Sequence, residues 1–488
     1  MKKFIKLLFL FSILAFIVLI IVLAIKTFGF SSKQLATVAP IKKIQLDDAC
    51  TERFVSSIKI PSLSYTDRVD TVAFHNLDTL LRQNYPMLYA RMHHKTINQF
   101  SQIYKWKGKD PSLAPILLIG HTDVVSIENK AAWEEPPFSG KIKDGYIWGR
   151  GTLDDKINVV GLIEAATMLM QDEYTPTRDL YFAFGHDEEV GGHAGAKSIA
   201  AYFAEQGIHF EFVLDEGLVI LQSALDGLEP PLAMIGIAEK GFTNLKLSVE
   251  LESGGHSAMP PKHTAIGMLA NAVAVLSNEP FPGRIDGATR GLLEYAGPEM
   301  GLFQKILFAN LWATKGLIKN KLGQDATSAA LIRTTTSPTI FNSGIKDNIL
   351  PTQASATINF RILPGESVAS VKQRVAEVID NDQIQISVDA GISSDPSPVS
   401  STNSFGFRVL QKTIQETYPE TVIAPGLVIA ATDARNYAGV ANDVYRFTPV
   451  SINRDDIGRI HGNNERISIE NYHDAIRFYK RLIENATK

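Results

Sequence analysis

Three apolar runs, each ending in or followed at once by acidic or imidazole side chains, constrain the fold of this chain more than any other feature. The runs are PILLIG at 115–120, LYFAFG at 180–185 and FEFVLDEG at 210–217. Continuous apolar runs of this length predict strands that are buried on both faces. Residues 157–170 and 194–206 lie between them and repeat apolar side chains at helical spacing. This strand–helix–strand order predicts an α/β domain with a mostly parallel sheet.

The pattern changes near residue 240, where strands with one exposed face are expected. Apolar side chains occupy every second position in NLKLSVEL at 244–251 and in ATINFRIL at 356–363. Strict alternation is typical of antiparallel strands that pack on one side only. We therefore expect residues 241–363 to form an inserted α+β domain, and helical residues 368–379 to begin the return to the α/β domain.

The N-terminus carries a long apolar segment. Three lysines, Lys2, Lys3 and Lys6, precede an uncharged run of 19 residues at 7–25, close to the roughly 20 residues that cross a bilayer as a helix. This length predicts an uncleaved signal anchor at residues 1–26, followed by a polar tether at 27–45. The lysines place the N-terminus in the cytoplasm and the body outside it, in an extracytoplasmic compartment. The alternative is secretion after signal cleavage.

Composition excludes several classes of protein. A length of 488 residues with 45% hydrophobic side chains predicts more than one domain and a substantial core. The net charge of −4, with no stripe of Lys and Arg, gives no basis for nucleic-acid binding. The single cysteine, Cys50, lies in a polar stretch, so neither an internal disulfide nor a cysteine nucleophile is expected.

Polar clusters follow the three predicted strands and recur at two other places. Because ligands bind beyond the carboxyl ends of strands in open α/β sheets, we expect these clusters to converge in one crevice. The clusters supply His121 and Asp123 in GHTDVV, Asp154 and Asp155 in WGRGTLDDK, Glu188 and Glu189 in HDEEVGG, Asp215 and Glu216 in LDEG, and His461 in GRIHGNNERI.

So many carboxylates in one crevice repel one another unless cations neutralise them. Two imidazoles with three carboxylates form a ligand set suited to zinc, and one shared carboxylate can bridge two ions. Two adjacent glutamates cannot easily serve the same ion. One of Glu188 and Glu189 is therefore expected to be a ligand, and the other a general base.

The motifs together resemble a known family. Residues from about 116 to the C-terminus resemble the di-zinc metallopeptidase and aminoacylase family, in the branch of carboxypeptidase S and the N-fatty-acyl-amino-acid hydrolases. The motifs are GHTDVV, WGRGTLDDK, DEEVGG, GGHSAMPP, NILP, FRILPGES, TDARNY and HGNNE, in the family's order. The resemblance implies a phosphorylase/hydrolase-like α/β catalytic domain in two parts, residues 46–240 and 364–488, with a lid domain of the dimerisation type at 241–363 between them.

The resemblance also implies a role for each polar residue of the centre. It implies two Zn²⁺ ions, with Co²⁺ or Mn²⁺ as substitutes, and a cis peptide bond after the bridging aspartate. The implied ligands are His121 and Asp215 for one ion, Glu189 and His461 for the other, and Asp154 as the bridge. Glu188 is the implied general base, and Asp123 the acid that orients the ring of His121.

Substrate contacts are implied in the same way. His256 resembles the histidine that stabilises the oxyanion, in relatives often from a partner subunit, which allows for a homodimer. Asn348 and Arg361 resemble the residues that hold the substrate carboxylate, for which an Arg fork is well suited. Thr432, Asp433 and Arg435 line the same pocket in relatives.

These roles predict a hydrolase that cleaves an amide bond next to a free carboxylate and releases an amino acid. Two substrate classes remain open, N-acyl amino acids and short peptides. Apolar residues 289–321 are either the core of a helical subdomain or a surface that receives an acyl chain or contacts a membrane. The alternative function is a non-catalytic, metal-containing binding protein at the membrane.

Overall fold

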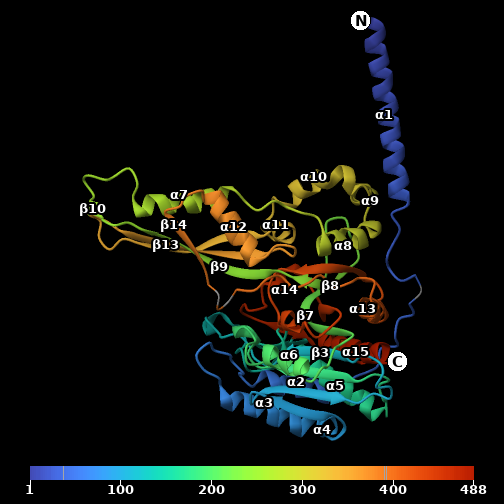
Figure 1. Ribbon diagram of the computed structural model, residues 1–488. Coiled ribbons are helices and arrows are strands. Elements are labelled where there is room, and N and C mark those ends of the chain that lie inside the picture. Colours follow the sequence, from blue (N-terminus) through green and yellow to red (C-terminus); the bar gives the residue numbers. More distant parts are fainter. Residues whose placement is uncertain (37, 390, 392) are drawn as a thin grey trace.

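A mixed eight-stranded sheet, parallel at its centre, forms the main body in a computed structural model that describes all residues except 37, 390 and 392 (Figure 1). The central strands β6, β3, β7 and β16 run parallel, and β1 and β2 are antiparallel additions at one edge. In sheet order the strands are β1 (His93–Ile97), β2 (Ser101–Trp106), β6 (Leu180–Gly185), β3 (Ile116–His121), β7 (Phe212–Leu221), β16 (Val444–Ile452), β8 (Leu232–Glu239) and β15 (Val422–Val428). The three buried strands predicted from the apolar runs are thus present as β3, β6 and β7.

Helices cover both faces of this sheet, which explains the continuous apolar runs. Every residue of β3 and β6 is buried. Because side chains alternate along a strand, Leu118 of β3 joins one core cluster and Leu117 joins another on the opposite face. The first cluster includes α5 (Lys156–Gln171) and α15 (Ile469–Ala486), and the second includes α6 (Ala196–Glu205). Helices α5 and α6 correspond closely to the predicted helices at 157–170 and 194–206.

A separate antiparallel sheet is built from the middle of the chain. Its order is β11 (Thr335–Ser343), β13 (Gln353–Ile362), β9 (Gly241–Glu250) and β14 (Ile384–Val388). Burial alternates along β9 and β13, as the sequence pattern predicts. The buried face packs on α7 (Ala265–Asn278) and α12 (Val368–Ile379), and the short strands β10 (Gly255–His256) and β12 (Ile349–Leu350) pair at the far tip (Figure 1).

The structure corrects the predicted boundary at residue 364. Helix α12 and strand β14 follow this position, yet β14 pairs with β9 of the second sheet. Val371 and Val375 of α12 lie in the same core cluster as Leu247 of β9. An amphipathic pattern predicts that a helix covers a sheet, but it does not say which sheet. The chain therefore returns to the main body only after β14, where Ser397 and Ser400 bond the backbone of β8, and α13 (Phe405–Thr417) follows.

The apolar segment 289–321 divides into two parts with different surroundings. Helix α8 (Gly287–Ala296) packs on β15, and Leu292 and Tyr295 belong to the main core. Helices α9 (Leu302–Ala309) and α10 (Leu311–Leu322) instead lie at the surface, and α11 (Ala326–Ile332) follows them. The expectation of a buried helical subdomain thus holds for α8, whereas much of α9 and α10 is exposed.

The N-terminal helix α1 (Lys2–Phe28) projects from the body (Figure 1), and by length and composition it could cross a membrane. Part of the predicted tether lies along the body. There the side-chain amide of Gln34 donates to the carbonyl of Ile423 and accepts the N–H of the same residue. The remaining elements complete the body. They are α2 (Asp48–Ile58), α3 (Thr71–Asn84), α4 (Pro86–Arg91), α14 (Arg454–Ile457), and the small sheet of β17 (Arg466–Ser468), β5 (Tyr146–Trp148) and β4 (Lys141–Lys143).

Candidate functional site

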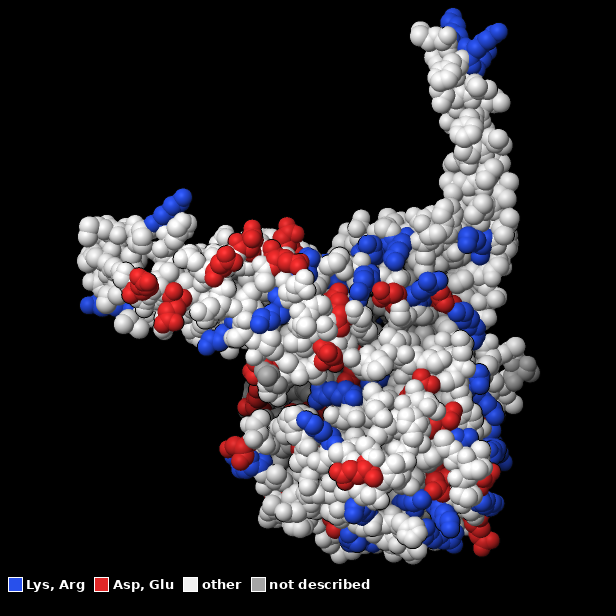
Figure 2. Space-filling model, in the orientation of Figure 1, with Lys and Arg blue, Asp and Glu red and all other residues white. Residues whose placement is uncertain are grey.

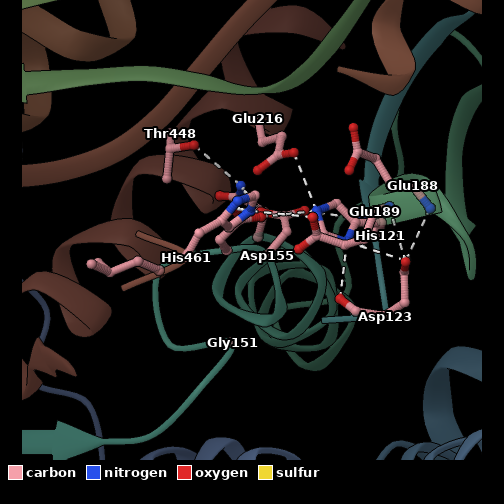
Figure 3. A network of polar contacts seen from close by, with 12 residues as sticks. His121, Asp123, Gly151, Asp155, Glu188, Glu189, Glu216, Thr448 and His461 are labelled. Atoms are coloured by element: carbon pink, nitrogen blue, oxygen red, sulfur yellow. Dashed lines mark hydrogen bonds and ion pairs between the residues drawn. The ribbon is translucent and has the colours of Figure 1, made fainter. Parts of the chain in front are cut away.

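The predicted polar clusters converge beyond the ends of the central strands (Figure 3). His121 is the last residue of β3, and Glu188 and Glu189 lie in a single 3-10 turn, η2 (Glu188–Val190), directly after β6. Asp154 lies just before α5, and His461 lies in the loop between α14 and β17. Residues far apart in the sequence thus meet at one edge of the sheet, as the parallel strand order predicts.

Two groups of potential metal ligands form there and share one carboxylate. His121, Asp154 and Glu216 form one group, and Asp154, Glu189 and His461 form the other; within each, the ligand atoms lie within 4.8 Å of one another. Asp154 Oδ1 lies 3.0 Å from His121 Nε2, and Asp154 Oδ2 lies 2.9 Å from His461 Nε2. Glu189 Oε2 lies 3.2 Å from His461 Nε2. Asp154 therefore has the position expected of a bridging ligand.

The structure places Glu216, not Asp215, in the first group. Glu216 Oε1 lies 3.2 Å from His121 Nε2. The buried carboxylate of Asp215 instead accepts two backbone N–H groups, from Glu216 at 2.9 Å and from Ala434 at 2.7 Å. Neighbouring residues of a strand point to opposite faces, so only one of the two can face His121. Asp215 thus holds the backbone around the group, and Glu216 takes the place beside His121 that the resemblance assigned to Asp215.

Asp123 lies next to the Nδ1 side of the His121 ring, where the resemblance predicts an orienting acid. Its buried Oδ1 lies 3.3 Å from His121 Nδ1, which also faces the backbone carbonyl of Asp123 at 3.0 Å. The same carboxylate accepts the N–H groups of Glu188 at 3.2 Å and Glu189 at 3.1 Å. A proton held on Nδ1 leaves Nε2 free toward Asp154 and Glu216. Asp123 therefore orients one ligand ring and positions the turn that carries the two glutamates.

Asp155 lies beside the centre but belongs to neither group. Its Oδ2 accepts the N–H of His121 at 3.1 Å, and its other oxygen accepts the side-chain amide of Asn158. Burial raises the pKa of this carboxyl well above its usual range. The peptide bond between Asp154 and Asp155 is cis, as the resemblance implied.

One residue that the sequence analysis did not single out connects both loops of the centre. The buried carboxylate of Glu465 accepts a hydrogen bond from Arg150 Nη1 at 2.5 Å, and from the N–H groups of Gly151 at 3.0 Å and Leu153 at 2.8 Å. Arg150 in turn donates to the carbonyl of His461 at 3.1 Å. Glu465 thus joins the segment before Asp154 to the loop that carries His461. Its place at the end of the HGNNE motif was the one available signal in the sequence.

The electrostatics of the centre fit divalent cations. Within the described residues, no Lys or Arg forms an ion pair with Asp154, Glu188, Glu189 or Glu216. The buried Oε1 atom of Glu189 has no hydrogen-bond partner, and such an atom is costly unless a cation or donor meets it. Burial raises the pKa of Glu216 to about 8. Hydrogen bonds to Asp154 and Glu189 raise the pKa of His461 to about 10, so the surrounding carboxylates favour a positive charge at this position.

Glu188 lies next to both groups and is a member of neither. Burial raises its pKa well above the usual range; His121 opposes this effect, and the carboxylates of Asp433 and Glu216 add to it. A carboxylate that stands beside a ligand set without joining it can accept and return protons. This arrangement is the one expected of a general base.

The predicted substrate residues fall into two sets, and members of one set contact segments beside the centre. Thr432 Oγ1 donates to Glu239 at 2.8 Å, and Asp433 has a buried oxygen without a hydrogen-bond partner. Arg435 donates to the carbonyl of Gly191, two residues beyond Glu189, at 3.4 Å. Burial lowers the pKa of Arg361, and the charge of Arg435 adds to this effect.

His256 and Asn348 form the other set, far from the centre. They meet at the tip of the second sheet, where Ser257 N–H donates to the Asn348 carbonyl at 3.2 Å, and both residues are exposed. In β13 the tip-side residue Gln353 pairs with Glu250, and Arg361 pairs with Phe242. Eight residues of strand separate these pairs, roughly 26 Å at the usual rise. One chain therefore does not bring His256 to its own metal groups.

The fold and these groups define a member of peptidase family M20/M25/M40, whose family model matches residues 117–485. The chain belongs to this family, and the resemblance and enzyme class predicted from the motifs are confirmed.

Relatives of known name cover nearly the whole chain. The probable carboxypeptidase S-like 2 of Dictyostelium discoideum is 41% identical over 483 residues, 96% of this chain and 92% of that protein. An N-fatty-acyl-amino acid synthase/hydrolase of Danio rerio is 35% identical over 497 residues, 99% of this chain and 96% of that protein. The crystal structure of an M20 family metallo-carboxypeptidase from Sulfolobus solfataricus shares the fold, with a TM-score of 0.64 at 17% identity over 91% of this chain and 100% of that one.

Proposed function

We propose that this chain is a dinuclear zinc hydrolase that cleaves an amide bond next to a free carboxylate and releases an amino acid. The observation that carries the proposal is the pair of ligand groups sharing Asp154, with no Lys or Arg ion pair to Asp154, Glu189 or Glu216 within the described residues. Imidazole nitrogens with carboxylate oxygens are a ligand set suited to zinc, for which Co²⁺ or Mn²⁺ can substitute. When bound, the cations would polarise the scissile carbonyl and acidify water.

Glu188 moves the proton in this scheme. Its carboxylate accepts a proton from the attacking water while the water oxygen forms a bond to the carbonyl carbon. Glu188 then returns the proton to the nitrogen of the leaving amine as the C–N bond breaks. The acyl product keeps the new carboxyl group, and the amine product is the free amino acid.

Arg361 and Arg435 are proposed to hold the free carboxylate of the substrate. Neither guanidinium forms an ion pair with a side chain of the described residues, and the charge of Arg435 disfavours the charge of Arg361. A bound anion would relieve this repulsion, and guanidinium groups bind carboxylates by paired hydrogen bonds. The contact of Arg435 with the Gly191 carbonyl supports a substrate that is oriented with its carboxylate toward this side of the centre.

His256 and Asn348 are proposed to act on a second copy of the chain, as the resemblance allows. Both are exposed at the tip of the second sheet, roughly 26 Å or more along the strands from Arg361. A homodimer in which each tip reaches the partner's centre would give these residues their implied roles. The second sheet would then serve as both the lid and the dimerisation domain.

Helix α1 is proposed to anchor the enzyme in a membrane as a single pass. Its apolar run is flanked by Lys2, Lys3 and Lys6 on one side and by Lys26 on the other. The excess of lysines at the N-terminus supports a cytoplasmic N-terminus and an extracytoplasmic body. Cleavage after α1, with release of the body, is the alternative, and the intact mass of the mature protein decides between them.

Two measurements test the catalytic proposal. Zinc-loaded full-length protein is assayed on N-oleoyl-phenylalanine and on a blocked dipeptide. Faster turnover of the lipid amide supports the N-acyl amino acid class, which the name of the Danio rerio relative favours, and equal or faster dipeptide turnover supports a peptidase.

The second measurement replaces the proposed base. Glu188→Gln should lower turnover by about 10²–10⁴-fold while the bound zinc stays at the wild-type amount. Glu205→Gln, on the exposed end of α6, is the matched control and should keep full activity. Unchanged turnover in the zinc-loaded Glu188→Gln variant would show that the mechanism is wrong. A wild-type protein that binds zinc without hydrolysing either substrate would instead support the non-catalytic alternative.

A further inference from the structure

Helices α9 and α10 expose large apolar side chains that the fold leaves uncovered. Leu302, Phe303, Trp312 and Leu317 are 70%, 69%, 57% and 61% exposed. Soluble surfaces seldom gather several large apolar side chains on one short segment. Helix α8, which precedes them, is instead packed on β15, so within residues 287–322 the exposed large apolar side chains lie on α9 and α10.

The charges of the same segment have one sign. Residues 302–322 contain four lysines and no aspartate or glutamate. Figure 2 shows Lys and Arg side chains gathered at the base of α1, over the α9 and α10 region, whereas Asp and Glu side chains gather over the region of α7 and α12. Apolar residues interleaved with lysines, with a tryptophan among them, are the composition of helices that lie in a membrane interface.

The position of the segment is fixed by contacts with α1. The buried side chain of Asn310, between α9 and α10, donates to Thr27 Oγ1 at 3.1 Å and to the Leu23 carbonyl at 3.3 Å. The apolar run at 7–25 spans about 28 Å as a helix, close to the thickness of a hydrocarbon core. Thr27 therefore lies where α1 would emerge from a bilayer, and α9 and α10 lie on the side from which α1 projects (Figure 1).

A groove of about 480 Å³ lies between α1 and α9. Its lining is mostly apolar and includes Leu23, Leu302 and Ile306, and Lys305 adds an ammonium group. An apolar groove beside a lysine, at the level of the lipid headgroups, matches an acyl chain that carries an anionic headgroup. The groove is continuous with the exposed apolar face, because Leu302 belongs to both.

We propose that α9 and α10 form a membrane-docking face that lies in the interface of the bilayer spanned by α1. The apolar side chains enter the acyl boundary, the lysines meet anionic headgroups, and a phospholipid acyl chain fills the groove beside α1. The proposal rests on the membrane anchor of the proposed function. It adds that the body is held against the bilayer in one orientation.

Trp312 provides a direct test, because the other three tryptophans, Trp106, Trp133 and Trp148, are only 5%, 8% and 1% exposed. Full-length protein is reconstituted in nanodiscs of phosphatidylcholine and phosphatidylglycerol, with or without acyl chains brominated near the headgroup. Bromine should quench tryptophan emission in the wild type, and most of this quenching should disappear in Trp312→Phe. Equal emission in brominated and unbrominated nanodiscs would overturn the proposal.

Failure of the anchor and failure of the docking face give different results. If α1 does not anchor the chain, the protein does not float with liposomes. If α1 anchors it but α9 and α10 stay in water, the protein floats and Trp312 remains unquenched.

A charge reversal tests the lysines separately. In the wild type, quenching should be stronger in nanodiscs that contain phosphatidylglycerol than in phosphatidylcholine alone. The double variant Lys315→Glu with Lys321→Glu should lose this increase. The control pair Lys107→Glu with Lys109→Glu, equally exposed but outside the segment, should retain that increase. The same lipid dependence in both double variants would show that the lysines of α10 do not meet the headgroups. Thermal unfolding of each variant verifies that the fold is intact.

Discussion

Replacing Glu465 by glutamine should destabilise the protein and weaken metal binding together. The glutamine keeps the size of the side chain but removes the charge that compensates Arg150, which is itself buried. It also places an amide where one carboxylate accepts the N–H groups of Gly151 and Leu153. Removing one partner of a buried ion pair typically costs about 3–5 kcal/mol, and we expect a loss of this size in the free energy of unfolding.

The same change should alter the metal groups, because Glu465 joins the segments that carry Asp154 and His461. Loss of a residue that positions a metal ligand commonly weakens affinity by about 10–100-fold. Unfolding by urea gives the stability, and competition with a fluorescent chelator gives the zinc affinity of the folded protein. The free energy of unfolding and the zinc affinity should both be lower in Glu465→Gln than in the wild type.

A matched control separates stability from positioning. Glu416 pairs with Arg481 at 2.7 Å through both oxygens, on α13 and α15 and away from the metal groups. Glu416→Gln should cost about 1–3 kcal/mol and leave the zinc affinity unchanged. The reasoning would be refuted if Glu465→Gln lost stability but bound zinc as tightly as the wild type, or if its stability did not change.

Three further predictions concern the assembly, the metal and pH. Coexpression of His256→Ala with Glu188→Gln should restore about a quarter of wild-type activity, because half of the dimers are mixed and each holds one complete site; an inactive mixture would contradict action across the dimer. Removal of zinc by a chelator should lower the free energy of unfolding by about 3 kcal/mol or more, relative to protein at a zinc concentration a hundred times the Kd. An unfolding temperature that calorimetry finds unchanged without zinc would count against a metal centre. Burial lowers the pKa of Lys240 to about 7 from 10.5, so the unfolded chain holds the extra proton between these values and unfolding free energy should rise with pH across this window. In urea titrations at pH 7, 8 and 9, the unfolding free energy of Lys240→Met should rise less with pH than that of the wild type. An equal rise in both proteins would show that Lys240 is not its source.

Much of the catalytic body was predictable because its signals are local. The strands β3 and β6 and the helix α5 follow from apolar runs and helical spacing, and the convergence of His121, Asp154 and Glu189 follows from parallel strand order. These features depend on patterns of a few residues, repeated along the chain. The position of α12 depends on which of two sheets offers a free face, and this is decided by contacts between distant segments.

The two errors of detail at the centre have a physical origin. Asp215 and Glu216 are adjacent acids on one strand, and the choice between them depends on which face of β7 meets His121. The pairing of β7 with β16 is irregular there, with a register shift between Arg446 and Phe447. Glu465 was missed because the HGNNE motif marks its position but not its role, which depends on hydrogen bonds to Arg150, Gly151 and Leu153, more than 300 residues away in the chain.

The place of β16 in the main sheet has a consequence for biosynthesis. This strand lies between β7 and β8, although it follows them by more than 200 residues in the chain. His461 and Glu465 come later still, and helix α15, which packs on α5, is the last element. A chain that emerges from its N-terminus cannot complete the central sheet before β16 is available. We therefore expect a chain truncated before β16 to have no hydrolytic activity.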